Sequence, residues 1–148
     1  DPIAIVDRPA IDLLLAAGAI VVACGGGGIP VVRRPNGRYE GVEAVIDKDL
    51  AASLLAHELA ADALVILTDV PYVMLRYGTP EARPLETVTV AELRQYQAEG
   101  HFASGSMGPK VEAAIRFVSG GRERRAVIAA LDHAREAVAG KSGTQIVG

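Results

Sequence analysis

Continuous apolar runs alternate along the chain with stretches whose apolar residues recur at helical spacing. An uninterrupted run of roughly four to eight aliphatic residues predicts a strand buried on both faces, as in a parallel sheet. Such runs occur at residues 19–24, 64–67 and 126–131, and we expect a strand at each. Each run also ends near glycine or polar residues, where a sheet commonly meets a ligand.

Helical spacing fills most of the sequence between these runs. A first helix around residues 11–15 is expected to end at Gly18, because glycine tolerates the backbone that closes a helix. Further helices are expected at 50–61, 90–99 and 111–118, with a short helix capped by Asp132 and an edge strand at 144–147. This alternation predicts a three-layer α/β/α fold around a mostly parallel central sheet.

Two connections have clear local signals. Pro35-Asn36-Gly37 lies between short extended pieces, so residues 31–42 are predicted to form a surface hairpin. Either Asp47 or Asp49 is the expected N-cap of the helix at 50–61.

Composition narrows the class of protein. With 148 residues, half of them hydrophobic, the chain is expected to form one domain with a sizeable core. The net charge of -3 and the scattered basic residues argue against a nucleic-acid partner. The basic cluster Arg122, Arg124 and Arg125 is interpreted as capping a helix end or as simply solvated.

Cysteine usage and hydropathy bear on location. Cys24 is the single cysteine, lies in an apolar run and is interpreted as a core residue in a reducing compartment. No stretch reaches the roughly 18 uncharged apolar residues of a membrane span. We therefore predict a cytoplasmic protein that does not associate with membranes.

Four familiar motifs are excluded by their spacing. A P-loop at Gly140-Lys141-Ser142 would need a glycine at Arg135, and a dinucleotide fingerprint starting at Gly25 meets Pro30 at its third glycine position. His57-Glu58 is followed by Ala61 where a zinc protease has its second histidine. The stretch 105–108 lacks the glycine spacing of a serine hydrolase.

Four loops remain, each at a predicted strand end or helix start. They are the glycine run 25–28, Asp47-Lys48-Asp49, Thr68-Asp69, and residues 105–110 ending at Lys110. The charge on a migrating phosphoryl group must be offset by fixed cations and amides. Two lysines at the mouths of separate helices therefore indicate phosphoryl transfer.

Three segments resemble a known family: ACGGGGIPV at 23–31, GVEAVIDKD at 41–49 and GHFASGSMGPKVEAA at 100–114. Together they resemble carbamate kinase, within the amino acid kinase fold, and the likeness runs in order from Ile3 to Val147. Ser104 stands where a proline is expected. The resemblance implies that residues 1–148 are a single nucleotide-binding domain, the C-terminal half of a longer kinase, in keeping with a sequence that opens at Asp1.

The resemblance also implies an activity. Carbamate kinases interconvert carbamoyl phosphate plus ADP with carbamate plus ATP in arginine metabolism, using Mg²⁺ held largely by the phosphates and no metal site of the protein's own. The intact enzyme is expected to be a homodimer. The half that binds the acceptor has no counterpart here, so this half alone is expected to be inactive.

Site residues follow from the matched motifs. Lys48 and Lys110 match the lysines that stabilise the transferring phosphoryl group, and Asp49 matches the aspartate that holds them, since a carboxylate offsets the repulsion of two ammonium groups. The implied nucleotide-binding residues are Thr68, Asp69, Val70, Tyr72, Ser106, Met107 and Gly108, and Gly25, Gly26 and Gly27 lie nearest the acceptor. Close packing of a strand end explains those glycines equally well.

Two alternatives stay open from the sequence. One is another amino acid kinase with a different small acceptor, such as a nucleotide, a phosphonate or an amino-acid carboxylate. The other is a nucleotide-binding or assembly module without catalysis.

Overall fold

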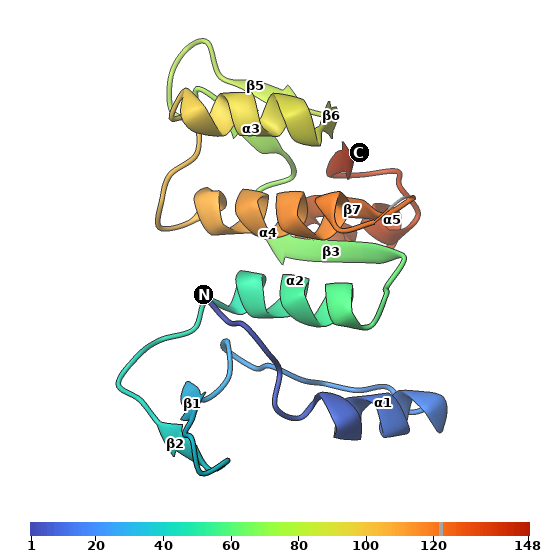
Figure 1. The fold of residues 1–148 in the computed structure, drawn as a ribbon. Helices are drawn as coiled ribbons and strands as arrows, with labels where there is room; N and C mark the ends of the chain where they lie inside the picture. Colours follow the sequence, from blue (N-terminus) through green and yellow to red (C-terminus); the bar gives the residue numbers. More distant parts are fainter. Residues whose placement is uncertain (122) are drawn as a thin grey trace.

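The computed structural model describes residues 1–121 and 123–148, which form an α/β body and an N-terminal arm of residues 1–46 (Figure 1). Arg122 lies outside the described residues. The elements in chain order are α1 (Arg8–Ala16), β1 (Val31–Arg33), β2 (Tyr39–Gly41), α2 (Lys48–Glu58), β3 (Ala63–Thr68), β4 (Val73–Leu75), β5 (Arg83–Leu85), β6 (Thr87–Thr89), α3 (Val90–Ala98), α4 (Met107–Ser119), β7 (Arg125–Ala130), a 3-10 turn (Leu131–His133), α5 (Ala134–Val138) and β8 (Thr144–Val147).

The main sheet has four strands in the order β3-β7-β8-β6. β3 pairs with β7 and β6 pairs with β8 in parallel, while β7 and β8 are antiparallel, so the sheet is mixed but mostly parallel. β8 is an inner strand, and the prediction of an edge strand at 144–147 is wrong. Its outer neighbour β6 has only three residues, Thr87, Val88 and Thr89, too few to give a periodic signal in the sequence.

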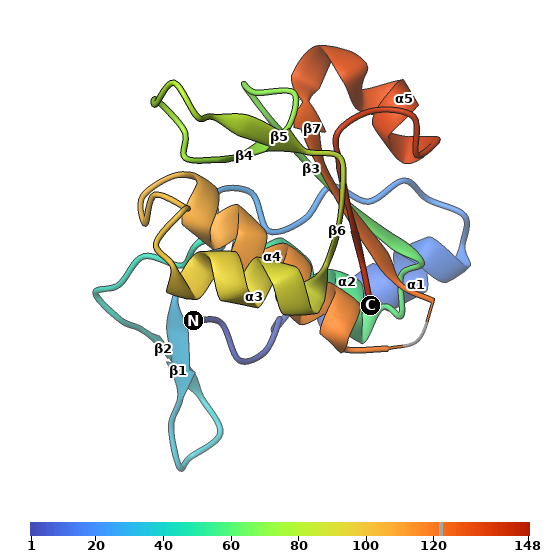
Figure 2. The same ribbon diagram turned by 90° about the horizontal axis from the view of Figure 1, so that it is seen from above.

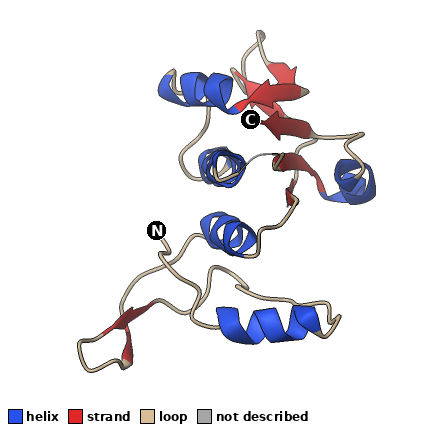
Figure 3. Cartoon of the chain, turned by 45° about the vertical axis from the view of Figure 1, so that its right-hand side comes forward, coloured by secondary structure: helices blue, strands red, loops and turns tan. Residues whose placement is uncertain are grey.

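Helices cover both faces of this sheet (Figures 2 and 3). α2 and α4 pack against each other and against the face of β3 and β7, and α3 extends that layer beside α4 and β6. α5 packs on the other face, against β7 and β3. The predicted three-layer α/β/α fold is therefore confirmed.

The larger core lies between the sheet and the layer of α2, α3 and α4. Its fully buried large side chains come from five different elements and include Val73, Leu93, Val111, Ile115, Phe117, Ile128 and Ile146. A smaller cluster of Val127, Ala129 and Ala137 lies beneath α5. Each face of β7 thus faces a different apolar cluster, which explains its uninterrupted hydrophobic sequence.

The predicted strand at 19–24 is not a strand in this structure. Ile20 and Val22 have 98% and 95% of their surface exposed. The apolar run has no neighbouring strand within the described part of the chain, so its hydrophobicity does not lead to burial here.

Cys24 ends this run and is not a core residue, in contrast to the prediction. Its thiol is half-buried and unpaired, and its backbone has a φ of +64°. Partial burial is the main reason that the pKa of the thiol is raised, and the negative charges of Asp7 and Glu58 raise it further.

Several helix ends and one hairpin agree with their sequence signals. Gly18 closes α1 with a φ of +78°, and the hairpin of β1 and β2 forms where it was expected. α3 begins with a capping box in which Thr89 and Glu92 bond each other's backbone N–H groups. α4 begins at Met107, four residues before the predicted start, because Pro109 fits the first turn of a helix.

The arginines after α4 cap two other helices. Arg124 donates to the carbonyl oxygen of His57 near the end of α2, and Arg125 donates to that of Val138 at the end of α5. The helix-end interpretation is thus confirmed for these two residues. Asp132 lies inside the 3-10 turn, where the chain bends before α5, so it is not the cap that the sequence predicted.

No helix in the described ranges is both long enough and apolar enough to cross a bilayer.

Candidate functional site

The start of α2 is set by Asp47. Its side chain accepts hydrogen bonds from the backbone N–H groups of Asp49 at 2.8 Å and Leu50 at 3.0 Å. The first backbone N–H groups of a helix have no acceptor within the helix, and an N-cap side chain commonly accepts their hydrogen bonds. Because Asp47 is the N-cap, the carboxylate of Asp49 is free to bind elsewhere.

The start of α4 is shaped by a tight approach of the preceding loop. The N–H of Gly108 donates to the carbonyl oxygen of Ala103 at 2.8 Å. A Cβ at position 108 would stand 2.9 Å from that oxygen, so only glycine fits without a shift. Met107 packs against the larger core, and Ser106 at the N-cap position is exposed and makes no capping bond. The side chain of Lys110 therefore extends from a first turn of α4 that is fixed by this hydrogen bond and by the packing of Met107.

The two helix starts meet at Asp49. Its Oδ2 atom lies 2.9 Å from the Nζ of Lys110 and 3.7 Å from the Nζ of Lys48. The side chains of Asp49 and Lys110 are 10% and 13% exposed, whereas that of Lys48 is 59% exposed. The three residues that the sequence grouped are thus brought together, with one ammonium held and the other open to solvent. We call Lys48, Asp49 and Lys110 the lysine clamp.

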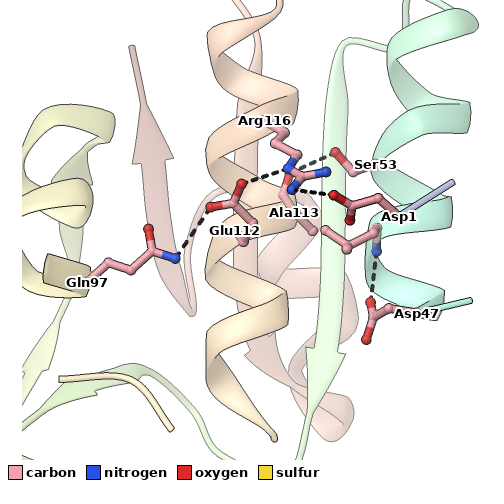
Figure 4. Close-up of polar contacts among 8 residues, drawn as sticks. Asp1, Asp47, Ser53, Gln97, Glu112, Ala113 and Arg116 are labelled. Atoms are coloured by element: carbon pink, nitrogen blue, oxygen red, sulfur yellow. Dashed lines mark hydrogen bonds and ion pairs between the residues drawn. The ribbon is translucent and has the colours of Figure 1, made fainter. Parts of the chain in front are cut away.

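The helices behind the clamp are tied one turn further along. Ser53 on α2 donates a 2.8 Å hydrogen bond to the carbonyl oxygen of Ala113 on α4, in a buried setting (Figure 4). Ala51, Ala113 and Ala114 are fully buried, and such small side chains let two helices approach closely. Ser53 has one signal in the sequence, as a polar residue four positions after Asp49 on the same helical face.

The end of β3 carries the next predicted site residues. Thr68 Oγ1 donates to Asp69 Oδ1 at 3.1 Å, and Val70 and Tyr72 are half-buried in the following turn. The carboxyl end of β3 and the starts of α2 and α4 lie at the same end of the molecule (Figure 1).

Thr144 fixes the chain just beyond this turn. Its buried hydroxyl accepts from the N–H of Val73 at 2.9 Å and donates to the carbonyl oxygen of Leu85. It thereby ties β4 and β5 to the main sheet, which anchors the turn that contains Tyr72. Thr144 was not predicted, because its partners are distant in sequence.

The glycine run approaches the start of α2 through Gly27. This residue is buried, has a φ of +130°, and a Cβ built on it would lie 2.1 Å from the carbonyl oxygen of Ile46. Close packing is therefore sufficient to explain this glycine. Gly25 and Gly26 are exposed, and a Cβ at either position would have no atom within 4 Å, so packing does not account for them.

The clamp makes no direct hydrogen bond or ion pair with the glycine run or with Thr68 and Asp69 within residues 1–121 and 123–148. Nor do those residues include a group of three or more metal-ligating side chains placed to hold an ion. What the clamp offers chemically is two ammonium groups at the mouths of two helices, where backbone N–H groups also favour negative charge. The molecule is thus an α/β protein with a site suited to a phosphate-like anion.

Comparison with known proteins agrees with that class. The model of the amino acid kinase family matches residues 1–130, and the chain belongs to this family. It is 57% identical over 147 residues to carbamate kinase from Thermococcus kodakarensis and 54% identical over 146 residues to that from Pyrococcus horikoshii, covering 99% of this chain and 46% of each relative. A structure of carbamate kinase from Giardia lamblia bound to AMP-PNP superposes with a TM-score of 0.94 at 44% identity, over 99% of this chain and 50% of the other.

The predicted resemblance to carbamate kinase is confirmed by these matches. The chain spans about half the length of the curated relatives that it matches.

Proposed function

We propose that this chain is the nucleotide-binding half of a carbamate kinase, which transfers a phosphoryl group between carbamoyl phosphate and ADP. The observation that carries the proposal is the lysine clamp, in which Asp49 joins the starts of α2 and α4 through Lys110 at 2.9 Å and Lys48 at 3.7 Å. High identity to several carbamate kinases supports the choice of substrate.

The clamp suits the chemistry of this transfer. As the phosphoryl group moves from ATP to an oxygen of carbamate, negative charge spreads over its equatorial oxygens and requires fixed positive groups. In our proposal the partly buried Lys110 supplies a preorganised charge, and the exposed Lys48 adds a second charge when substrates bind. The carboxylate of Asp49 offsets the repulsion between the two ammonium groups, and both groups can still contact the phosphoryl group.

The nucleotide is proposed to lie between the carboxyl end of β3 and the start of α4. Thr68, Asp69, Val70 and Tyr72 would line one side, and Ser106, Met107 and Gly108 the other. The Giardia relative was solved with AMP-PNP, which supports a nucleotide as a ligand of the intact enzyme. Mg²⁺ enters the proposal with the phosphates, which supply most of its oxygen ligands in such sites. Gly25, Gly26 and Gly27 are proposed to face the acceptor, and the cytoplasmic location and the homodimer stay predictions from the sequence.

A chimaera tests the proposed activity. In it, residues 1–148 replace the 147 matching residues of the Thermococcus kodakarensis relative. With carbamoyl phosphate, ADP and Mg²⁺, we expect ATP formation that is saturable in both substrates. A folded chimaera without turnover, beside an active parent enzyme, would refute the proposal.

Calorimetry distinguishes the two forms of the alternative without catalysis. Binding of ATP by a folded but inactive chimaera would favour a nucleotide-binding module without catalysis. No binding at all would favour a role in assembly.

A further inference from the structure

The loop between α3 and α4, residues 99–106, leads directly into the turn of α4 that carries Lys110. Gly100 ends α3 with a φ of +80°, and the N–H of His101 donates to the carbonyl oxygen of Tyr96 at 3.1 Å. This is a common way for a helix to end, with a glycine in the left-handed conformation. The backbone of His101 is therefore fixed at the end of α3, before the chain crosses to α4.

The side chain of His101 uses both of its ring nitrogens. Nδ1 lies 3.4 Å from the backbone N of Arg76, and Nε2 lies 3.2 Å from Oε2 of Glu99. Because a backbone N–H can only donate, Nδ1 is the acceptor, which leaves the proton of the neutral ring on Nε2, where it is donated to the carboxylate. The ring also meets that of Tyr96 edge to face, with 5.9 Å between the centroids. These contacts set both the tautomer and the orientation of the ring.

Arg76 begins the turn between β4 and β5. Its φ of +50° is in the left-handed region, and its carbonyl oxygen accepts from the hydroxyl of Thr79 at 2.8 Å and from the N–H of Thr79 at 3.1 Å. The β4-β5 ladder ends at the pair Leu75 and Arg83, so the N–H of Arg76 lies beyond it. The Nδ1 atom of His101 supplies an acceptor for this N–H group, which the ladder does not.

The same loop is anchored on its other side to the start of α4. Phe102 packs against the larger core, and the carbonyl oxygen of Ala103 accepts from the N–H groups of Ser106 at 3.3 Å and Gly108 at 2.8 Å. A displacement of the loop at His101 is therefore passed to residues 106–108 through a short and well-bonded stretch of chain.

The contact between His101 and Arg76 joins the two segments that are proposed to hold the nucleotide. One comprises residues 68–72 and continues as β4 to Arg76, and the other is residues 106–108. The β4-β5 turn and the α3-α4 loop lie at the end of the body where α2 and α4 begin (Figure 1). Within residues 1–121 and 123–148, the side-chain bonds of His101 do not extend to the lysine clamp.

The ring of His101 does not fill the core. It borders a surface hollow of about 360 Å³ that is also lined by Arg76, Arg83 and Glu99. A substitution here changes polar contacts and opens no cavity in either apolar cluster. The role of His101 can therefore be tested with little disturbance of the packing.

We propose that His101 is a positioning residue for the nucleotide, which holds the α3-α4 loop against the β4-β5 turn and so sets the separation of the two segments that line the nucleotide site. The inference rests on the proposed function for the identity of the ligand. Because the side chain of His101 does not contact the clamp, it acts on the affinity for ADP and not on the transfer of the phosphoryl group.

Three substitutions in the chimaera test this role. His101→Phe keeps a ring but removes both hydrogen bonds, and it is expected to raise the KM for ADP about threefold to tenfold, the scale of a lost hydrogen bond, while kcat changes by less than about twofold. His101→Asn places an amide oxygen where Nδ1 lies and is expected to restore most of the affinity. His101→Gln restores only the donor to Glu99 and is expected to resemble the phenylalanine variant.

His57→Phe is the matched control. The ring of His57 also bonds another element, since its Nδ1 lies 2.7 Å from Nη1 of Arg124, but it does so at the end of α2 that is opposite the clamp. We expect this variant to keep the parental KM for ADP, even if its stability falls. Circular dichroism checks that each variant folds, and calorimetry with ADP and Mg²⁺ gives a Kd that does not depend on turnover.

Several results would overturn the proposal. They are a parental KM and Kd for ADP in the phenylalanine variant, an asparagine variant as weak as the phenylalanine variant, an equal loss in the His57 control, and a fall in kcat at unchanged KM. A parent chimaera that binds ADP without turnover would count against the proposed function alone, and the Kd values of the variants would then decide the role of His101. A folded parent that binds no ADP would overturn both.

Discussion

Ser53 and Ala113 join α2 to α4 by a buried hydrogen bond of 2.8 Å, one turn behind the residues that meet at Asp49. The bond fixes the separation of the two helices through two uncharged residues. It therefore supports the lysine clamp without taking part in it.

Ser53→Ala is expected to lower the free energy of unfolding by about 1 kcal/mol, the usual net value of a hydrogen bond. Urea titration of the 148-residue chain, or of the chimaera, measures the change. Ser119→Ala provides the control, because Ser119 ends α4 in an exposed position and its loss is expected to matter little. Equal effects of the two substitutions would show that the buried bond contributes nothing.

Lys110→Ala or Lys48→Ala in the chimaera is expected to lower kcat by about two orders of magnitude or more, the scale of one lost preorganised charge. Steady-state formation of ATP from carbamoyl phosphate and ADP measures the loss. Lys141→Ala is the control, since Lys141 is exposed beyond α5 and distant in sequence from the clamp. Near-normal turnover in both clamp variants would remove the lysines from the mechanism.

Gly27→Ala is expected to lower the activity of the chimaera by about a hundredfold, since displacements near 1 Å at a site have effects of that size. A methyl group at this position meets the carbonyl oxygen of Ile46, directly before the N-cap of α2. Gly41→Ala serves as the control, because no atom lies within 4 Å of its Cβ position and the residue is not among the proposed site residues. Parental rates in both variants would show that the close approach of Gly27 to Ile46 does not position the site.

Thr144→Val is expected to destabilise the chain by about 2 kcal/mol, because it leaves the buried N–H of Val73 without an acceptor. Valine keeps the shape of threonine, so the change isolates the hydroxyl. Thr87→Val on the exposed side of β6 is the matched control. Thermal unfolding measures the stability of both variants. A Thr144 variant as stable as the control would contradict a stabilising role of the Thr144 hydroxyl.

The stability of the chain is expected to depend on pH through Glu112. Burial alone would raise the pKa of this carboxyl group, but bonds from Arg116 at 2.6 Å and Gln97 at 3.4 Å outweigh it and hold the pKa below its ordinary value (Figure 4). The carboxylate therefore stabilises the fold above the unfolded pKa of about 4.3. That contribution is lost as the pH falls through the lower, folded value.

Glu112→Gln is accordingly expected to be less stable than the parent at pH 7, with the difference shrinking as the pH falls below about 4. Urea unfolding at a series of pH values measures it. Glu136→Gln is the control, because Glu136 is exposed and makes no ion pair in the described part of the chain. A constant difference between parent and Glu112 variant across the series would exclude the linkage.

The elements that the sequence predicted correctly are those whose signals are local. α2, α3, β3 and β7 each have a periodic or continuous apolar pattern, and Asp47 is a cap readable within three residues. β5 and β6 were missed because strands of three residues have no measurable period.

The errors have a different cause. Residues 19–24 have the composition of a buried strand, but composition does not say which polypeptide segment supplies the neighbours. Thr144 bonds to Val73, 71 positions away, so no local pattern identifies it. Ser53 shows in the sequence only as a polar residue on the helical face of Asp49, and its partner Ala113, 60 positions away, has no local signal. For the candidate site, the motifs named the three clamp residues, and the geometry adds that Asp49 is buried and Lys110 partly buried while Lys48 is open.

The inner position of β8 has a consequence for synthesis on the ribosome. β6 and β7 are made earlier, yet in the described sheet they are joined only through β8, whose residues 144–147 come after both. Until those residues emerge, β6 has no strand beside it and β7 has one open edge. The main sheet of the nascent chain therefore cannot be completed until β8 is synthesised and pairs with β7 on one side and β6 on the other.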